Sequence, residues 1–109
     1  IDSSRHFLPT RAIKRIIDAM SWVKLNVLHW HLVDDQAFPV QIPSVSTMWD
    51  GSFSLQERYT AVINELELIV GDVEEIVEYA KARGVHVIPE MDVPGHASSW
   101  CVGGNHRYL

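Results

Sequence analysis

The stretch from residue 85 to residue 96 constrains this chain most, with the sequence Val-His-Val-Ile-Pro-Glu-Met-Asp-Val-Pro-Gly-His. It begins as an apolar, β-branched run and changes to acids, prolines, a glycine and a histidine. Short apolar runs bounded by turn residues are typical of buried strands, and glycine and proline end them sharply. We therefore expect Glu90, Asp92 and His96 at the carboxyl end of a buried strand, where parallel α/β folds build their sites.

The residues before this stretch alternate between strand patterns and helix patterns. We expect the end of a strand within residues 1–7, a helix over 11–23, a strand over 25–33 and a helix over 72–83. Asp72 and Glu75 predict a capping box at the start of the last helix. Alternation of this kind predicts an α/β fold with a parallel sheet and right-handed crossovers. Polar residues after each strand favour a (β/α) barrel over a chance distribution on the surface.

Two segments between these elements have no clear period. Residues 38–59 carry prolines, a glycine and many serines, which predicts a long loop held by Trp49, Phe53 and Tyr59. Residues 61–71 fit either a short strand or a helix, and the choice stays open. The chain therefore contains one long connection whose length alone makes it a candidate for function.

The composition limits the class of protein. Of 109 residues, 47% are hydrophobic and 21% are charged, which is typical of one small domain over residues 1–109. The net charge of −5 without a basic stripe argues against a nucleic-acid partner. No apolar run approaches the ~20 residues of a membrane span. Cys101 is the only cysteine, so no disulfide forms within the chain, and no Gly-x-Gly-x-x-Gly follows a strand to indicate a dinucleotide site.

Adjacent carboxylates follow the second predicted strand, at Asp34 and Asp35. Two carboxylates beside a buried strand are costly unless they are hydrogen-bonded or paired with cations. Arg5, at the end of the first predicted strand, is a candidate partner. The sequence therefore predicts an ion pair between the ends of neighbouring strands.

The histidines admit more than one interpretation. His29 and His31 form a His-x-His pair that alternation places on one face, where it either binds a metal or is buried with its hydrogen bonds satisfied. Glu90 and Asp92 are metal ligands, acid/base groups or partners of those histidines. His96 is the strongest functional candidate, since an Asp–His pair holds the imidazole tautomer and raises its basicity.

Three motifs resemble those of the family-20 glycoside hydrolases, the β-N-acetylhexosaminidases. They are Asp-Ser-Ser-Arg-His-Phe-Leu-Pro at 2–9, Lys-Leu-Asn-Val-Leu-His-Trp-His-Leu-Val-Asp-Asp-Gln-Ala-Phe-Pro at 24–39, and the segment 79–96 that ends in Pro-Glu-Met-Asp-Val-Pro-Gly-His. The likeness is strongest to the eukaryotic lysosomal, vacuolar and secreted members. It implies that residues 1–109 are the N-terminal portion of a catalytic TIM barrel, covering about the first three βα units.

The resemblance also implies an activity. Family members remove terminal β-linked N-acetylglucosamine or N-acetylgalactosamine from glycans, glycoconjugates and chito-oligosaccharides by substrate-assisted retention. The acetamido oxygen of the substrate attacks the anomeric carbon, an Asp orients the acetamide, and a Glu acts as acid and then base. No cofactor and no metal are implied. A lysosomal, vacuolar or secreted location and a dimeric full-length enzyme are consistent with the family.

Carried over by motif, Arg5 binds hydroxyls of the terminal sugar, because a guanidinium fork suits a vicinal diol. Asp34 contacts the sugar or orients His96, and His96 lies beside the acid/base Glu. The supporting residues are Asp92, Glu90, Asp35 and His31, which makes the His-x-His pair structural.

Two departures from the family pattern matter. The catalytic Asp-Glu pair follows a Gly-Gly on a later strand in the family, and residues 1–109 end before that strand. Gly103-Gly104-Asn105-His106 echoes the motif only faintly and lies too close to His96, so we interpret it as a coincidence. We therefore expect this chain alone to be inactive. Residues 61–71 also form a longer link than the family has. The alternatives are a non-catalytic sugar-binding product, or a metal-dependent barrel hydrolase that uses His29 and His31.

Overall fold

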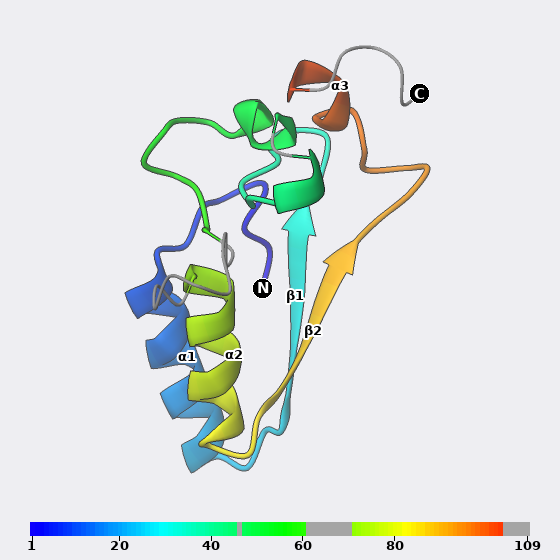
Figure 1. The fold of residues 1–109 in the computed structure, drawn as a ribbon. Coiled ribbons are helices and arrows are strands. Elements are labelled where there is room, and N and C mark those ends of the chain that lie inside the picture. The colour runs from blue at the N-terminus through cyan, green and yellow to red at the C-terminus, as the bar shows by residue number, and fades with distance from the viewer. Residues whose placement is uncertain (46, 61–70, 104–109) are drawn as a thin grey trace.

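The computed structural model describes residues 1–45, 47–60 and 71–103. The elements follow in the order α1 (Thr10–Trp22), β1 (Val27–Val33), the short 3₁₀ helices η1 (Pro43–Val45) and η2 (Met48–Gly51), α2 (Asp72–Lys81), β2 (His86–Met91) and α3 (Trp100–Gly103) (Figure 1). The predicted helices and later strands are confirmed with small shifts at their ends. Residues 61–70 lie outside the described residues, so the alternatives for that segment stay open.

The sheet of the described residues has two parallel strands, β1 and β2. Their register pairs Val27 with His86 and His31 with Glu90. The N-terminal segment contributes one parallel bridge, between Asp2 and His31, rather than a strand. The backbone N–H of His31 donates to Ile1 and its carbonyl accepts from Ser3, so this segment and β2 lie on opposite edges of β1. The mixed α/β class is confirmed, and β1 is the central element.

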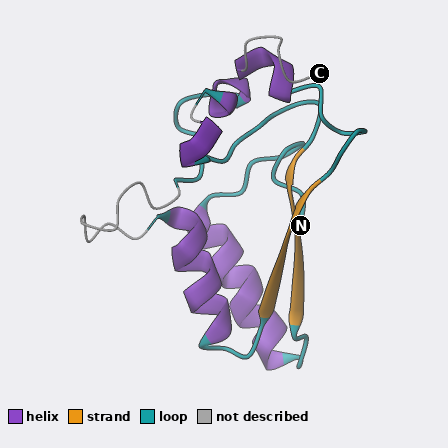
Figure 2. Cartoon of the chain, turned by 45° about the vertical axis from the view of Figure 1, so that its right-hand side comes forward, coloured by secondary structure: helices purple, strands orange, loops and turns teal. Residues whose placement is uncertain are grey.

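Both long helices cover the same face of the sheet (Figures 1 and 2). Their buried residues recur every three or four positions, which is the spacing of one helical face: Ile13, Ile17 and Met20 on α1, and Ile76 and Ala80 on α2. These side chains form one core with Trp30, Leu28 and Val85. In the described residues, no helix is long and apolar enough to cross a membrane.

The start of α2 differs from the predicted capping box. Gly71 is the N-cap and makes no side-chain bond. The Asp72 carboxylate accepts the backbone N–H and hydroxyl of Thr60 and the hydroxyl of Thr10, while Glu75 pairs with Lys14 of α1. Tertiary partners have thus replaced the local reciprocal bonds that a capping box requires. They join α2 to α1 and to the end of the long loop.

The long loop is anchored chiefly by Tyr59. This side chain is buried, its hydroxyl donates to the carbonyl of Leu8 at 2.5 Å, and its ring packs edge-on against Trp30 at 5.0 Å. Trp49 is partly buried beneath the guanidinium of Arg58. The expected anchoring role of Phe53 is wrong, because that side chain is 53% exposed. Tyr59 thereby supports the N-terminal segment that carries Arg5.

Candidate active site

The predicted site residues Arg5, Asp34 and His96 meet at the carboxyl end of β1. Asp34 directly follows β1, Arg5 follows the N-terminal bridge, and His96 lies in the loop after β2. Oδ2 of Asp34 is 2.5 Å from Nη1 of Arg5 and 2.8 Å from Nδ1 of His96. The Asp34 side chain is only 1% exposed, whereas Arg5 and His96 are 43% and 50% exposed. A buried carboxylate therefore holds two solvent-facing polar groups, and the predicted pairing of Arg5 with this acid is present.

Asp34 is kept ionised by its neighbours. Burial by itself raises the pKa of a carboxyl group, but here the backbone N–H of Asp35, at 2.6 Å from Oδ1, stabilises the charged form. Nε2 of His31 at 2.9 Å, the ring of His96 and the charge of Arg5 act in the same direction and lower the pKa of Asp34 to about 2. The carboxylate is consequently ionised, and accepts hydrogen bonds, at pH values well above 2.

Arg5 is oriented by Asp2, a residue that the motif analysis did not assign to the site. One oxygen of Asp2 accepts the backbone N–H groups of Ser4 and Arg5, each at 3.1 Å, and the other pairs with Nε of Arg5. The hydrogen bond to Asp2 is the main reason that the pKa of Arg5 is raised. An Asp that bonds backbone N–H groups two and three residues later forms an Asx-turn, and this spacing is the signal that could have identified Asp2.

Glu90 bridges the two histidines of β1. Because β1 and β2 run side by side, Glu90 Oε1 lies 2.5 Å from His31 Nδ1 and Oε2 lies 2.5 Å from His29 Nε2. The bonds to His31 and then His29 lower the pKa of Glu90. Burial opposes a charge on His31, but the bonds to Glu90 and Asp34 outweigh it and raise its pKa.

The interpretation of satisfied, buried histidines holds for one member of the pair. His31, with 12% of its side chain exposed, has both ring nitrogens hydrogen-bonded. His29 is 59% exposed, and its bond to Glu90 bears out one of the alternatives that the sequence left open for that acid. Both side chains lie on one face, as strand alternation predicts. His31 bonds Asp34 directly and Glu90 bonds His31, so both lie beside the cluster of Arg5, Asp34 and His96, called the Asp34 cluster below; their supporting role stays a prediction.

The loop that carries His96 is fixed by Asp35. Oδ1 of Asp35 accepts the backbone N–H of Ser98 at 2.9 Å, which ties the loop after β2 to the loop after β1. His96 has φ of 59°, and a non-glycine residue in this left-handed region costs about 1 to 2 kcal/mol. The tether and the Asp34 contact hold this conformation. Asp92 lies 3.9 Å from His96 Nε2, which is too far for a direct hydrogen bond.

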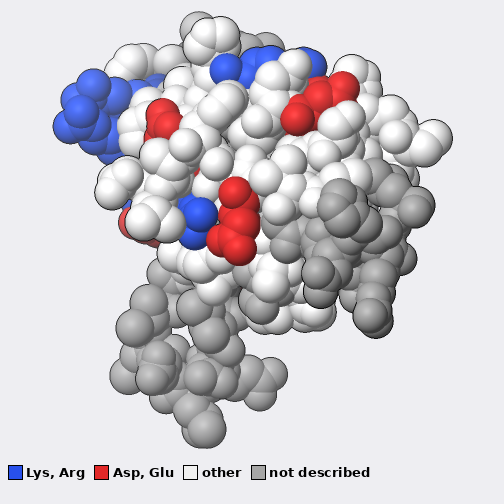
Figure 3. All heavy atoms as spheres, turned by 90° about the horizontal axis from the view of Figure 1, so that it is seen from above, with Lys and Arg blue, Asp and Glu red and all other residues white. Residues whose placement is uncertain are grey.

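The cluster of Arg5, Asp34 and His96 combines charges of both signs, a pattern that suits a polar, neutral ligand. Figure 3 looks onto this end of the molecule and shows basic side chains beside acidic ones rather than a patch of one sign. Atoms of His31, Asp34 and His96 lie within 4.8 Å of one another, close enough to hold a metal ion. Oδ2 of Asp34, however, already accepts from these rings and from the permanently charged Arg5. A cation there would displace hydrogen bonds and face the guanidinium.

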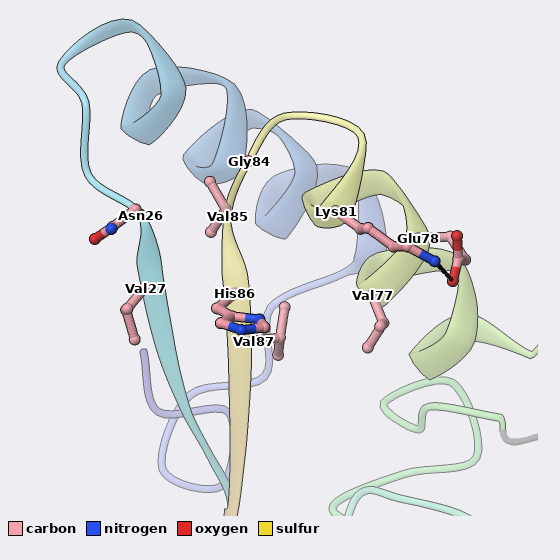
Figure 4. A pocket seen from close by; sticks show the side chains of 9 residues that line it. All are labelled: Asn26, Val27, Val77, Glu78, Lys81, Gly84, Val85, His86 and Val87. Atoms are coloured by element: carbon pink, nitrogen blue, oxygen red, sulfur yellow. Dashed lines mark hydrogen bonds and ion pairs between the residues drawn. The ribbon is translucent and has the colours of Figure 1, made fainter.

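The opposite end of the strands contains a hollow of about 540 Å³ (Figure 4). It lies beside the first residues of β1 and β2 and the exposed face of α2. Its apolar lining comes from Val27, Val77, Val85 and Val87, and its polar rim includes Lys81 and Glu78, which pair at 3.4 Å. None of the predicted site residues lines it. The chemistry-bearing groups and this hollow are therefore at different ends of the sheet.

Comparisons with known proteins agree with this geometry. The sequence profile of glycosyl hydrolase family 20, catalytic domain, matches residues 1–109. The chain is 52% identical over 103 residues to β-hexosaminidase 3 of Arabidopsis thaliana, covering 94% of this chain but 18% of that protein. Thus it spans about a fifth of the relative's length.

Solved structures of this family have the same fold over this segment. A chitobiase of Flavobacterium johnsoniae superposes with a TM-score of 0.78 at 37% identity, over 94% of this chain and 14% of that one. A mutant β-hexosaminidase of Streptomyces plicatus in complex with its product N-acetylglucosamine gives a TM-score of 0.77 at 34% identity, over 94% and 20% of the two chains. The chain belongs to the catalytic domain of glycosyl hydrolase family 20.

Proposed function

We propose that this chain is part of a β-N-acetylhexosaminidase that removes terminal β-linked N-acetylhexosamine from glycans, glycoconjugates or chito-oligosaccharides. The observation that carries the proposal is the meeting of Arg5, Asp34 and His96 at the carboxyl end of β1 in a family-20 chain. In parallel α/β folds this end of the strands is where catalytic residues lie. The Streptomyces relative binds N-acetylglucosamine as its product, which supports the same class of sugar here.

Arg5 and Asp34 bind the hydroxyls of the terminal sugar. The Arg5 guanidinium is half-exposed and uses Nε and Nη1 for Asp2 and Asp34, which leaves further N–H donors for a diol. Asp34 is an ionised acceptor that also orients the ring of His96. Together they recognise a neutral sugar by donors and acceptors of fixed direction.

His96 serves the acid/base step by standing beside a Glu that this chain does not supply. Its Nδ1 is engaged by Asp34 while half of the side chain faces solvent, so Nε2 is placed to contact a neighbouring carboxyl group. The acetamido oxygen of the substrate then attacks the anomeric carbon, and the Glu protonates the leaving oxygen. Asp35, Asp92, Glu90 and His31 support these groups, and no metal takes part.

The fold we infer is about the first three βα units of an eight-unit barrel. Its support is the parallel pairing of β1 and β2, the N-terminal bridge on the other edge of β1, and helices on one face. The family association supports a lysosomal, vacuolar or secreted enzyme, and a dimer when complete. An Asp34 that stays ionised in acid is compatible with an acidic compartment.

Two other functions are less well supported. A sugar-binding protein without turnover would use Arg5 and Asp34 but no acid/base pair. A metal-dependent hydrolase would need the ring nitrogens of His29 and His31, and Glu90 and Asp34 already bond those atoms. The hydrogen-bonded histidines favour the glycosidase over the metalloenzyme.

The test uses a complete β-hexosaminidase in which residues 1–109 of this chain replace the matching segment, called the chimera below. We expect the chimera to release the chromophore from an aryl N-acetyl-β-glucosaminide, and to lose that activity on His96→Ala. Binding of N-acetylglucosamine by a folded chimera without turnover would favour the sugar-binding protein instead.

A further inference from the structure

His31 occupies an unusual position between two acidic side chains. Its Nδ1 is 2.5 Å from Oε1 of Glu90 and its Nε2 is 2.9 Å from Oδ2 of Asp34. With only 12% of its side chain exposed, the ring cannot easily turn away from either partner. Each nitrogen therefore has a carboxylate as its neighbour.

The chemistry of these contacts fixes the protonation of the ring. An ionised carboxylate accepts hydrogen bonds and cannot donate them, whereas a neutral imidazole has only one N–H. Both carboxyl groups favour their ionised forms, since the pKa of each is lowered by its hydrogen-bond donors. Two acceptors require two donors, so both nitrogens of His31 carry protons and the ring is an imidazolium.

We infer that His31, held as an imidazolium by Glu90, is a positioning residue that fixes the Asp34 carboxylate on which Arg5 and His96 converge. This deepens the proposed function and rests on it, because the Asp34 cluster is the sugar-binding and His96-orienting group of that proposal. His31 acts through Asp34 and does not itself touch the substrate. Glu90, on the neighbouring strand, is the group that keeps it charged.

The surroundings of His31 favour a positive ring on balance. His29 shares Glu90, and the ring of His96 lies edge-on at a centroid distance of 5.8 Å. The titratable groups that act on His31 or contact its partners, from the N-terminal segment, β1, β2 and the adjoining loops, are Asp2, Arg5, His29, Asp34, Glu90, Asp92 and His96. Asp2 acts in the same direction as Glu90 and Asp34 on the pKa of His31.

The expected pH dependence follows from the raised pKa of His31. A histidine whose pKa is raised in the folded protein adds stability that is complete below its unfolded value of 6.5 and is lost as the pH rises through the folded value. Glu90 must be ionised for the pair to exist, which holds above its ordinary value of 4.5. The stabilisation is thus greatest between about pH 4.5 and pH 6.5, and it declines as the pH rises above 6.5.

The experiment compares the chimera with its Glu90→Gln variant, since Gln keeps the shape of Glu and removes the charge. At about pH 5 His31 is protonated in both proteins, so their kcat/KM values should differ little. As the pH rises above 6.5, the variant should lose the imidazolium before the parent does. We then expect the parent's kcat/KM to exceed the variant's by about tenfold, the size expected when one charged hydrogen bond to Asp34 is weakened. Glu90→Asp, which retains the charge, should restore part of the loss.

Matched controls separate this role from a structural one. Glu78→Gln removes an exposed carboxylate at the other end of the sheet and should leave kcat/KM unchanged at every pH. Thermal unfolding of the parent and of Glu90→Gln between pH 4.5 and 8.5 reports the ion pair without using activity. We expect the difference in Tm to be largest from about pH 5 to 6.5 and to shrink above that range.

The outcomes distinguish this inference from the proposed function. A loss of kcat/KM by Glu90→Gln that is equal at all pH values, with a Tm difference independent of pH, would overturn the imidazolium while leaving the hydrolase in place. If the chimera does not hydrolyse the aryl N-acetyl-β-glucosaminide but shows the pH-dependent difference in Tm, the charged His31 would be supported and the proposed hydrolase function contradicted.

Discussion

The two ends of the β1–β2 pair are built from the same strands and differ in almost every physical respect. At the carboxyl end, Asp34 is buried and contacts Arg5, His31 and His96. At the amino end, valine side chains line a hollow, and the exposed Lys81–Glu78 pair borders it. At one end a buried charge has several polar partners, and at the other valine side chains leave apolar surface open.

This difference distinguishes the candidate site at the carboxyl end from the exposed apolar surface at the amino end. Partly exposed donors grouped around a buried acceptor can bind a polar ligand without refolding, because their directions are already set. A hollow lined by valines has few groups that could give direction to a ligand, and parallel sheets normally cover such apolar surface with further helices. The polarity of the side chains and the number of their partners, rather than the presence of a hollow, therefore favour the carboxyl end as the candidate site.

The largest expected effect concerns the carboxyl end in isolation. We expect the purified 109-residue chain to show no turnover of an aryl N-acetyl-β-glucosaminide, while the chimera does. In the proposed mechanism Arg5, Asp34 and His96 bind the sugar and orient the reacting groups, but the acid/base Glu and the acetamide-orienting Asp of the family are not among the motifs of this chain. A neutral Asn105 cannot stabilise the oxazolinium cation as a carboxylate does. Turnover by the isolated chain that disappears on His96→Ala would refute this expectation.

The next effect compares the two ends directly. In the chimera, Asp34→Asn should lower kcat/KM by about a hundredfold or more, because charged hydrogen bonds to the sugar and to His96 each contribute about 1.5 to 3 kcal/mol. Val77→Ala, at the amino-end hollow, should change kcat/KM little and cost about 1 kcal/mol of stability or less, since Val77 is 38% exposed. Equal losses of activity in both variants would remove the functional distinction between the ends.

A smaller effect is expected within the carboxyl end. Arg5→Lys in the chimera keeps the positive charge and loses the planar fork, so we expect KM to rise about tenfold with a smaller change in kcat. Steady-state kinetics with the same aryl substrate measure this. Unchanged kinetics would remove Arg5 from the sugar-binding group, whereas a fall in kcat alone would move its role to the chemical step.

The smallest expected effect concerns metal content, because we expect no bound metal ion at the carboxyl end. Elemental analysis of the dialysed chimera should find no stoichiometric zinc, because the ring nitrogens of His31 already bond Glu90 and Asp34. One equivalent of zinc that is lost in the His31→Ala variant would contradict this and would support the metal-dependent hydrolase.

The amino-acid sequence by itself determined the helices and strands and predicted where the candidate site residues meet. Apolar periodicity predicted α1, β1, α2 and β2, because burial of one helical face or one strand is a local property of the pattern. The polar residues after the strands predicted which end of the sheet carries the chemistry, and the opposite charges of Arg5 and Asp34 predicted their pairing. Their catalytic and binding roles stay predictions that the chimera tests.

Only the tertiary structure decided which partner each polar group takes. Asp72 and Glu75 match a capping box, yet Thr60, Thr10 and Lys14 take their side chains instead. Residue types likewise could not assign Glu90 to His29 and His31, since that contact depends on the parallel register of β1 and β2. Hydrogen bonds between segments distant in sequence depend on register and packing, which no local pattern encodes, whereas strand and helix periodicity is written in neighbouring residues.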